Sequence, residues 1–327
     1  MQNKLNIRLV LLLMTSFMAM SILVGCGSKE PPPPEITPEL LRADRSFLRG
    51  DTEQGFEKLQ AMIDADPNSF YGYYHLGFFH LMNRNPDLGK EALAKAAEIY
   101  PEHPGPHYFM GLADYGGGMG TGVPEPMMTG LRLSEKRWGL ALPDTAAQAR
   151  KAWQLIWKKK PRDAQGIMTG LVNNDPDNPK MLFLQAYAMY MRGNNLAALE
   201  PLFRSIELDP TFASAQALLG ACQYNTSKRA EAKTTCLKAL ELDPTQALAL
   251  HIYGQLLSEA SEYTDAFNHM LLSVLEDPTV PFYYEYLGAT LIRFGYNDLG
   301  SEILSAMERT NSFLGNHFQW PGYVPQN

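Results

Sequence analysis

The segment Phe212–Pro244 reads FASAQALLGACQYNTSKRAEAKTTCLKALELDP, and its spacing recurs along most of the chain. The Asp-Pro pair that closes it, Asp243-Pro244, is preceded by Asp209-Pro210 and followed by Asp277-Pro278, at steps of 34 residues. A fixed period of this size indicates a repeat architecture, in which each unit buries its apolar face against its neighbours.

Two registers of small residues follow the same period. One register is Ala43, Gly77, Gly111, Ala152, Ala186, Gly220, Gly254 and Gly288, and the other is Gly55, Gly89, Gly130, Ala164, Ala198, Ala232, Ala266 and Gly300. Every step is 34 residues except one of 41, which falls between Gly111 and Ala152 in the first register and between Gly89 and Gly130 in the second. An insertion of 41 − 34 = 7 residues therefore lies between Gly111 and Gly130.

The period, the small residues and the recurring proline resemble the tetratricopeptide repeat. The resemblance covers eight repeats, at 36–69, 70–103, 104–144 with the insertion, 145–178, 179–212, 213–246, 247–280 and 281–311. It implies an all-α fold, a right-handed superhelical solenoid of helix-turn-helix units. The residues agree with this reading, because each repeat has two helical segments separated by a break such as Gly193-Asn194. No segment alternates with period two, so we expect no sheet.

The first 25 residues have the pattern of an export signal, in which Lys4 and Arg8 precede an apolar stretch. The stretch ends in Leu23-Val24-Gly25-Cys26, which resembles the lipobox of bacterial lipoproteins. That resemblance implies that Cys26 is the first mature residue and is acylated on its sulfur and its amine. The alternative is an uncleaved anchor helix, which would not need a cysteine at its end.

Residues 26–35 predict a tether between this anchor and the folded part. Pro31–Pro34 favours an extended polyproline spacer, and Gly27-Ser28-Lys29-Glu30 cannot form a core. Several acyl chains hold a protein firmly on a membrane, whereas one chain does not. Gly27, rather than Asp, follows the cysteine, which resembles lipoproteins sent to the outer membrane. We therefore expect a lipid-anchored protein on the outer membrane, facing the periplasm.

The net charge of the chain restricts the kinds of partner that it can bind. The formal charge is −7, and it becomes −9 when Lys4 and Arg8 are removed, so an acidic chain without a basic run argues against nucleic acid as a partner. No cofactor motif is recognised.

After Cys26 only Cys222 and Cys236 remain. By the resemblance they lie on the two antiparallel helices of one repeat, and they form either one disulfide or two buried free thiols.

The resemblance also implies a binding surface, since the first helix of each tetratricopeptide repeat lines the concave face. The inward positions predict a stripe of aromatic rings as the partner site, namely Tyr71, Tyr74, Phe78, Tyr108, Tyr115, Trp153, Trp157, Phe183, Tyr187 and Tyr190. Rigid amphipathic rings suit an interface. The alternative is that many of these rings pack inside the superhelix or beneath the chain's own tail, residues 312–327.

Other candidate sites are weak. The glycine-rich insertion 116–126 lacks the lysine of a phosphate-binding loop, and Pro104 and Pro106 separate His103 from His107, so we predict no nucleotide or metal site. We expect this insertion to be a lip over the groove, a partner contact or a neutral extension. No nucleophile has a motif around it.

The sequence therefore predicts a scaffold or adaptor, not an enzyme, that binds a protein or peptide partner for envelope assembly. The candidate processes are pilus or secretion assembly, recruitment of cell-wall enzymes and outer-membrane biogenesis. The alternative is a component of a transport system that holds a small apolar molecule in the aromatic groove. An enclosed pocket, rather than an open trough, would favour the second reading.

Overall fold

The computed structural model describes residues 34–115, 124–137, 151–152, 155 and 160–316. Backbone contacts divide the chain into residues 1–35 and a second unit, residues 36–327. Its described residues form helices without any strand, so the predicted all-α repeat solenoid is confirmed. Within the described part, no helix combines the length and the apolar character needed to cross a bilayer.

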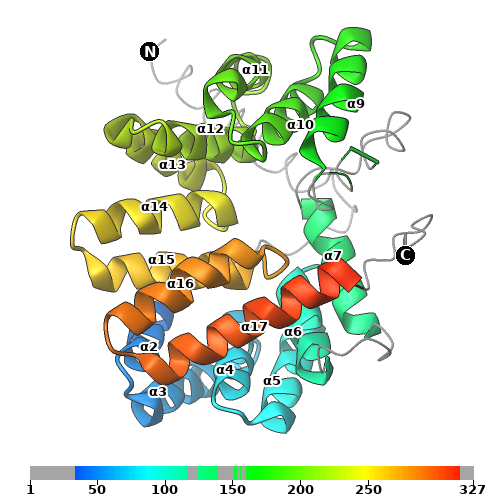
Figure 1. Cartoon of the computed structure of the whole chain (residues 1–327). Helices are drawn as coiled ribbons and strands as arrows, with labels where there is room; N and C mark the ends of the chain where they lie inside the picture. Colours follow the sequence, from blue (N-terminus) through cyan, green and yellow to red (C-terminus); the bar gives the residue numbers. More distant parts are fainter. Residues whose placement is uncertain (1–33, 116–123, 138–150, 153–154, 156–159, 317–327) are drawn as a thin grey trace, which may run out of the picture. The chain divides into compact units, whose positions relative to one another are not determined.

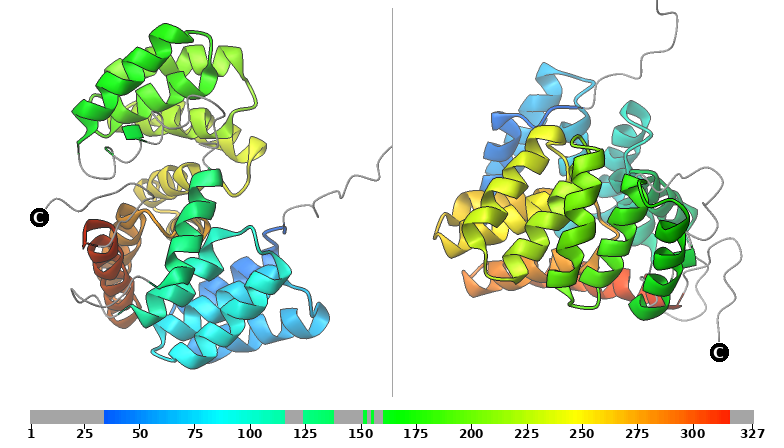
Figure 2. Two further views of the ribbon diagram at one scale, coloured as in Figure 1. Left: turned by 90° about the vertical axis from the view of Figure 1, so that its right-hand side faces the viewer. Right: turned by 90° about the horizontal axis from the view of Figure 1, so that it is seen from above.

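Successive helices form pairs that stack side by side (Figure 1, Figure 2). Their bounds are α2 (Pro38–Leu48), α3 (Thr52–Ala65), α4 (Phe70–Met82), α5 (Pro86–Ile99), α6 (Pro104–Asp114), α7 (Glu125–Arg137), α9 (Pro161–Asn174), α10 (Pro179–Tyr190), α11 (Asn195–Leu208), α12 (Ala213–Asn225), α13 (Arg229–Leu242), α14 (Ala247–Glu259), α15 (Tyr263–Glu276), α16 (Pro281–Arg293) and α17 (Asn297–Asn316). The insertion residues 116–123 lie outside the described residues.

The recurring Asp-Pro sequence begins a fixed turn between repeats. The carboxylate of Asp209 accepts hydrogen bonds from the backbone N–H and the hydroxyl of Thr211, at 3.0 and 2.7 Å. Asp243 binds Thr245 in the same way, and Asp277 binds Thr279. These side-chain turns stop one helix and set the direction of the next. The following helices then begin at Ala213, Ala247 and Pro281, which coincide with repeat starts read from the sequence.

Glycine is required where the two helices of a repeat meet. A Cβ atom added to Gly77 on α4 would lie 2.9 Å from the carbonyl oxygen of Gly89 on α5, and 2.6 Å from Leu93 Cγ. The reverse contact, from Gly89 to the Gly77 carbonyl, would be 3.1 Å. The two backbones can therefore approach closely only without side chains at this point.

The last helices also pack against the first ones. α15 contacts α2 and α6, and α17 contacts α4 and α6, although well over a hundred residues separate these elements in sequence. The carboxyl-terminal repeats therefore lie on the face of the amino-terminal repeats that the sequence assigns to partner binding.

Candidate functional site

The five rings predicted to line the inner face of the second and third repeats are buried. Tyr71, Tyr74 and Phe78 project from α4, whereas Tyr108 and Tyr115 belong to α6 and its carboxyl-terminal cap. Their exposed fractions lie between 0% and 4%. This is the self-packing alternative rather than an open groove, so a partner cannot reach these five rings in the conformation described here.

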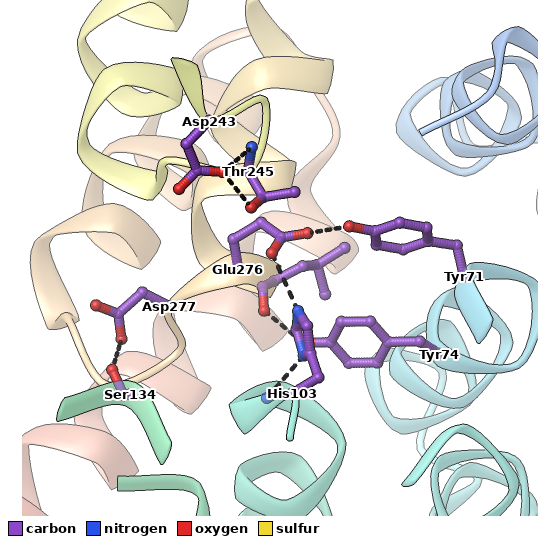
Figure 3. Close-up of polar contacts among 10 residues, drawn as sticks. Tyr71, Tyr74, His103, Ser134, Asp243, Thr245, Glu276 and Asp277 are labelled. Atoms are coloured by element: carbon purple, nitrogen blue, oxygen red, sulfur yellow. Dashed lines mark hydrogen bonds and ion pairs between the residues drawn. The ribbon is translucent and has the colours of Figure 1, made fainter. Parts of the chain in front are cut away.

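The carboxyl end of α15 is hydrogen-bonded to these rings (Figure 3). The Tyr71 hydroxyl donates to Glu276 Oε1 at 2.7 Å, and the Tyr74 hydroxyl donates to the backbone carbonyl of Leu275 at 2.5 Å. His103 Nε2 lies 3.0 Å from Glu276 Oε2. His103 Nδ1 accepts from the Gly105 N–H at 3.1 Å, so a neutral His103 has its proton on Nε2 and donates it to the carboxylate. We call this group the carboxylate clasp.

Gly105 makes the clasp sterically possible. A Cβ atom at this position would lie 1.8 Å from the Tyr74 hydroxyl oxygen and 2.9 Å from the carbonyl oxygen of Leu275. The missing side chain leaves the space through which the Tyr74 hydroxyl reaches the end of α15.

A further hydrogen bond and a small cavity lie beside the clasp. The Ser134 hydroxyl, on α7, donates to Asp277 Oδ1 at 2.7 Å (Figure 3). A cavity of about 30 Å³ lies beside Ser134, Asp243 and Glu276. A space of this size holds one or two water molecules and is too small for a peptide.

The carboxyl-terminal helix α17 covers the rings of α6. The ring centroid of Phe313 lies 6.1 Å from that of Tyr108 and 6.0 Å from that of Tyr115. Arg309 Nη1 donates to the backbone carbonyl of Leu112 at 3.1 Å. Phe313 belongs to the tail that the sequence analysis offered as a cover, and it is fully buried here.

The remaining rings predicted to bind a partner differ in their exposure. Phe183 and Tyr187 on α10 are buried, at 1% and 5% exposure, whereas Tyr190 at the end of the same helix is half-buried. Trp153 and Trp157 lie outside the described residues.

Three tyrosines lie on the first helices of separate repeats in the carboxyl-terminal half. Tyr190 is on α10, Tyr224 on α12 and Tyr286 on α16. Burial is the main reason that the pKa values of Tyr190 and Tyr224 are raised, and the nearby Tyr286 hydroxyl contributes to both shifts. Tyr286 is 47% exposed, and Met191, next to Tyr190, is 41% exposed. We call these three residues the tyrosine cluster, in which Tyr286 is exposed and Tyr190 and Tyr224 are half-buried.

An exposed ion pair borders the tyrosine cluster. The Tyr224 hydroxyl donates to Glu259 Oε1 at 2.7 Å, and Arg229 Nε donates to Glu259 Oε2 at 2.8 Å. The guanidinium carbon of Arg229 lies 4.0 Å from the centroid of the Tyr224 ring. Burial acts to raise the pKa of Glu259, but the hydrogen bonds from Tyr224 and Arg229 outweigh it and lower that pKa. The carboxylate is therefore ionised at neutral pH, and the ring of Tyr224 is held between two charged groups.

His251 lies beneath the tyrosine cluster. Its ring centroid is 5.1 Å from that of Tyr286 and 4.9 Å from that of Tyr283. Its Nε2 accepts a hydrogen bond from the Gln255 amide at 3.1 Å, while its Nδ1 has no partner among the described residues. Burial lowers the pKa of His251 to about 3, so the imidazole is neutral.

The disulfide left open for Cys222 and Cys236 is not formed, because both residues are free, buried thiols. The reason is geometric. A Cβ atom at Gly220 would lie 2.6 Å from Cys236 Sγ, so the Cys236 thiol faces the Gly220 side of α12. Cys222 follows two residues later, which turns it more than half a helical turn away. Burial raises the pKa of each thiol to about 12.

Sequence reasoning missed Glu276, the central residue of the clasp. One signal was present, because the residue before the recurring Asp is apolar in neighbouring repeats, as at Leu208 and Leu242, and becomes acidic at Glu276. A buried acid requires partners. The sequence could not say which residues supply them.

Comparisons with known proteins agree with the repeat fold. The tetratricopeptide repeat family matches residues 235–267, which span most of the second helix of the sixth repeat and the whole first helix of the seventh. No curated protein matches the chain.

Solved structures of repeat proteins are similar only remotely. MamA of Desulfovibrio magneticus RS-1 is 18% identical over 51% of this chain and 95% of its own, with a TM-score of 0.37. Pseudomonas aeruginosa pilF is 18% identical over 73% of this chain and 88% of its own, with a TM-score of 0.36. YrrB, titled a TPR protein with an unusual peptide-binding site, is 13% identical over 70% and 96%, with a TM-score of 0.33. None of the three determines what this chain binds.

Proposed function

We propose that this protein is a lipid-anchored scaffold of the bacterial envelope that binds a protein or peptide on the inner face of its last four repeats. It acts by binding rather than by catalysis. The observation that supports this proposal is the tyrosine cluster, in which Tyr286 is exposed and lies near the half-buried Tyr190 and Tyr224 of two other repeats.

The chemistry of the cluster suits a peptide-like partner. Tyrosine offers a large contact area at a low entropic cost, together with a hydroxyl that can donate or accept. The neighbouring Arg229–Glu259 pair adds a fixed positive and a fixed negative group at the rim. These groups favour partners whose charges are complementary to them. The five buried rings of α4 and α6 are not part of this proposal, because they serve the closure.

The proposed anchoring is supported by the sequence Leu23-Val24-Gly25-Cys26 and by the proline tether that follows it. An acylated amino terminus on a tether of about ten residues would hold the repeats close to the outer membrane. Envelope assembly is the proposed setting, since a partner bound there would also be kept at that surface.

Site-specific photo-crosslinking tests the binding surface. A benzoylphenylalanine placed at Tyr286 in the native host should crosslink to one discrete envelope protein or peptide. The matched control is Leu196, which is 67% exposed on α11 and lies outside the cluster, and it should give no such product. Equal crosslinking from both positions, or from Leu196 alone, would contradict the proposed surface.

A further inference from the structure

A second candidate site lies where the first repeat meets the last two. It is an open pocket of about 180 Å³ between the carboxyl end of α2, the start of α15 and the end of α16. Its lining comprises Arg45, Leu48, Arg49, Tyr263, Thr264, Phe267, Phe294 and Tyr296. We call it the arginine pocket, and it shares no residue with the tyrosine cluster.

The pocket has an excess of positive charge. Arg45 and Arg49 lie one helical turn apart, and neither forms an ion pair with any described residue. Arg42, one turn earlier, pairs with Glu39 at 2.7 Å, so acids are available on this helix but not at the pocket. None of the residues that line the pocket is acidic, although the chain has a net charge of −7. A cationic site in an acidic protein is complementary to an anion.

Aromatic rings form the opposite wall of the pocket. The ring centroids of Tyr263 and Phe294 are 4.5 Å apart, and those of Phe267 and Phe294 are 5.7 Å apart. Tyr263 is 38% exposed and Phe294 is 36% exposed, so these rings leave apolar surface uncovered. Covering this apolar surface with another aromatic ring is favourable, because it removes the surface from water.

The volume also limits the ligand. A cavity of about 150 Å³ in another protein accommodates benzene. The 180 Å³ of the arginine pocket therefore suits one six-membered ring and a small substituent. Two guanidinium groups beside such a space favour a carboxylate, which Arg49 and the Nη groups of Arg45 can bind, since Arg45 Nε already donates to the Leu41 carbonyl at 3.0 Å.

We infer that the arginine pocket binds an aromatic ring that bears a carboxylate. The ring packs against Phe294 and Tyr263, and the carboxylate lies on Arg45 and Arg49. Such a group is present both in a free aromatic acid and in the last residue of a peptide that ends in Phe, Tyr or Trp. This site is separate from the proposed partner surface and does not depend on it.

The surroundings leave room for either source of the group. A wider groove of about 740 Å³ adjoins the pocket and shares Arg49 and Tyr296 with it. Asn83 and Asn297 also line that groove, and their amides could pair with the backbone of the preceding residues of a peptide. A free acid would use the pocket alone.

Calorimetric titration of the full chain in mild detergent tests the inference. The probes are 3-phenylpropionate, its neutral amide, a hexapeptide that ends in Phe with a free carboxylate, and the same peptide amidated. We expect at least one carboxylate probe to bind, with an affinity at least tenfold above that of its amide. Tighter binding of the acid alone assigns the free molecule, and tighter binding of the peptide assigns a chain terminus. Equal affinity of acid and amide in both pairs, or no binding by either acid, would overturn the inference.

Variants separate binding from a structural role of the arginines at a helix end. The double change Arg45→Gln and Arg49→Gln should weaken carboxylate binding at least tenfold, and Thr264→Phe should abolish it by filling the pocket without removing charge. Arg293→Gln, on an exposed arginine that does not line the pocket, is the matched control and should bind as the wild type does. Unchanged binding in Thr264→Phe, with its melting temperature preserved, would contradict the assignment. So would a loss in Arg293→Gln equal to that in the double variant.

Discussion

The Tyr71 hydroxyl donates a 2.7 Å hydrogen bond to the Glu276 carboxylate, across 205 residues of sequence. Both groups are buried, with 4% exposure for Tyr71 and 1% for Glu276. Removing one partner of a buried hydrogen bond leaves the other unsatisfied, which costs about 1–3 kcal/mol. The second repeat and the seventh are therefore coupled energetically, and the rings between them belong to the core.

The aromatic residues should separate into two classes on truncation. Tyr74→Ala should lower the free energy of unfolding by about 3–5 kcal/mol, because it removes a fully buried ring. Tyr286→Ala should cost about 1 kcal/mol or less, since 47% of this side chain is already exposed, but it should reduce partner crosslinking from a benzoylphenylalanine placed at Met191, which is 41% exposed. Urea denaturation of both variants checks the first quantity. A small decrease in the free energy of unfolding for Tyr74→Ala would indicate that this ring is not part of the core and is again a candidate binding residue.

Acid should destabilise the protein through His251. Above about pH 6.5 this imidazole is neutral in both the folded and the unfolded chain. Below that pH the imidazole of His251 is protonated in the unfolded chain, whereas in the folded chain it stays neutral down to about pH 3. The free energy of unfolding should therefore fall by about 1.4 kcal/mol per pH unit from this group alone.

The test of this pH dependence is a difference between variants. Burial lowers the pKa values of His80 and His269 as well, so the wild type alone would not isolate one residue. His251→Phe should have a shallower loss of stability between pH 6 and pH 4, whereas the control His107→Gln should retain the slope of the wild type. Identical slopes for wild type and His251→Phe would rule out this role.

The two internal cysteines should titrate as free thiols. In the unfolded, unreduced Cys26→Ser variant we expect two reactive thiols, Cys222 and Cys236. In the folded chain both should react slowly with a thiol reagent, because they are buried and their pKa values are raised to about 12. Fewer than two thiols after unfolding would show that a bridge forms in spite of the geometry.

Replacing Cys26 by Ser should release the protein from membranes or block its processing, because the proposed acyl chains would be attached to that sulfur and to the amine of the same residue. Membrane fractionation and the mass of the mature amino terminus measure both effects. Retention in the membrane with an unchanged amino terminus would exclude Cys26 as the anchor.

The repeat period was sufficient to predict local structure. Small residues such as Gly77 and Gly89 identify where helices touch, and Asp-Pro pairs such as Asp243-Pro244 identify where they end. Both signals act within one repeat, so one sequence is enough to detect them. The inner positions implied by the resemblance selected five rings of α4 and α6 that the structure buries, so the prediction that they form an open partner site was wrong for the conformation described.

The closure could not be predicted in the same way. It depends on how small rotations between repeats add up, and only that sum decides whether α15 meets α4 or an open groove remains. The same limit applies to Cys236, whose direction relative to Cys222 depends on helix rotation rather than on helix pairing. Glu276 departs from the apolar register of its position, but its partners Tyr71 and His103 are defined only once the chain has folded.

A double-mutant cycle between Tyr71 and Glu276 tests the closure most directly. The single changes Tyr71→Phe and Glu276→Ala and the double change are compared by urea denaturation of the full chain. Since the bond is buried and only 2.7 Å long, we predict a coupling energy of about 1 kcal/mol or more. Additive effects, with a coupling energy of about zero in three folded variants, would show that the two repeats are not joined and that the inner face of the amino-terminal repeats is open.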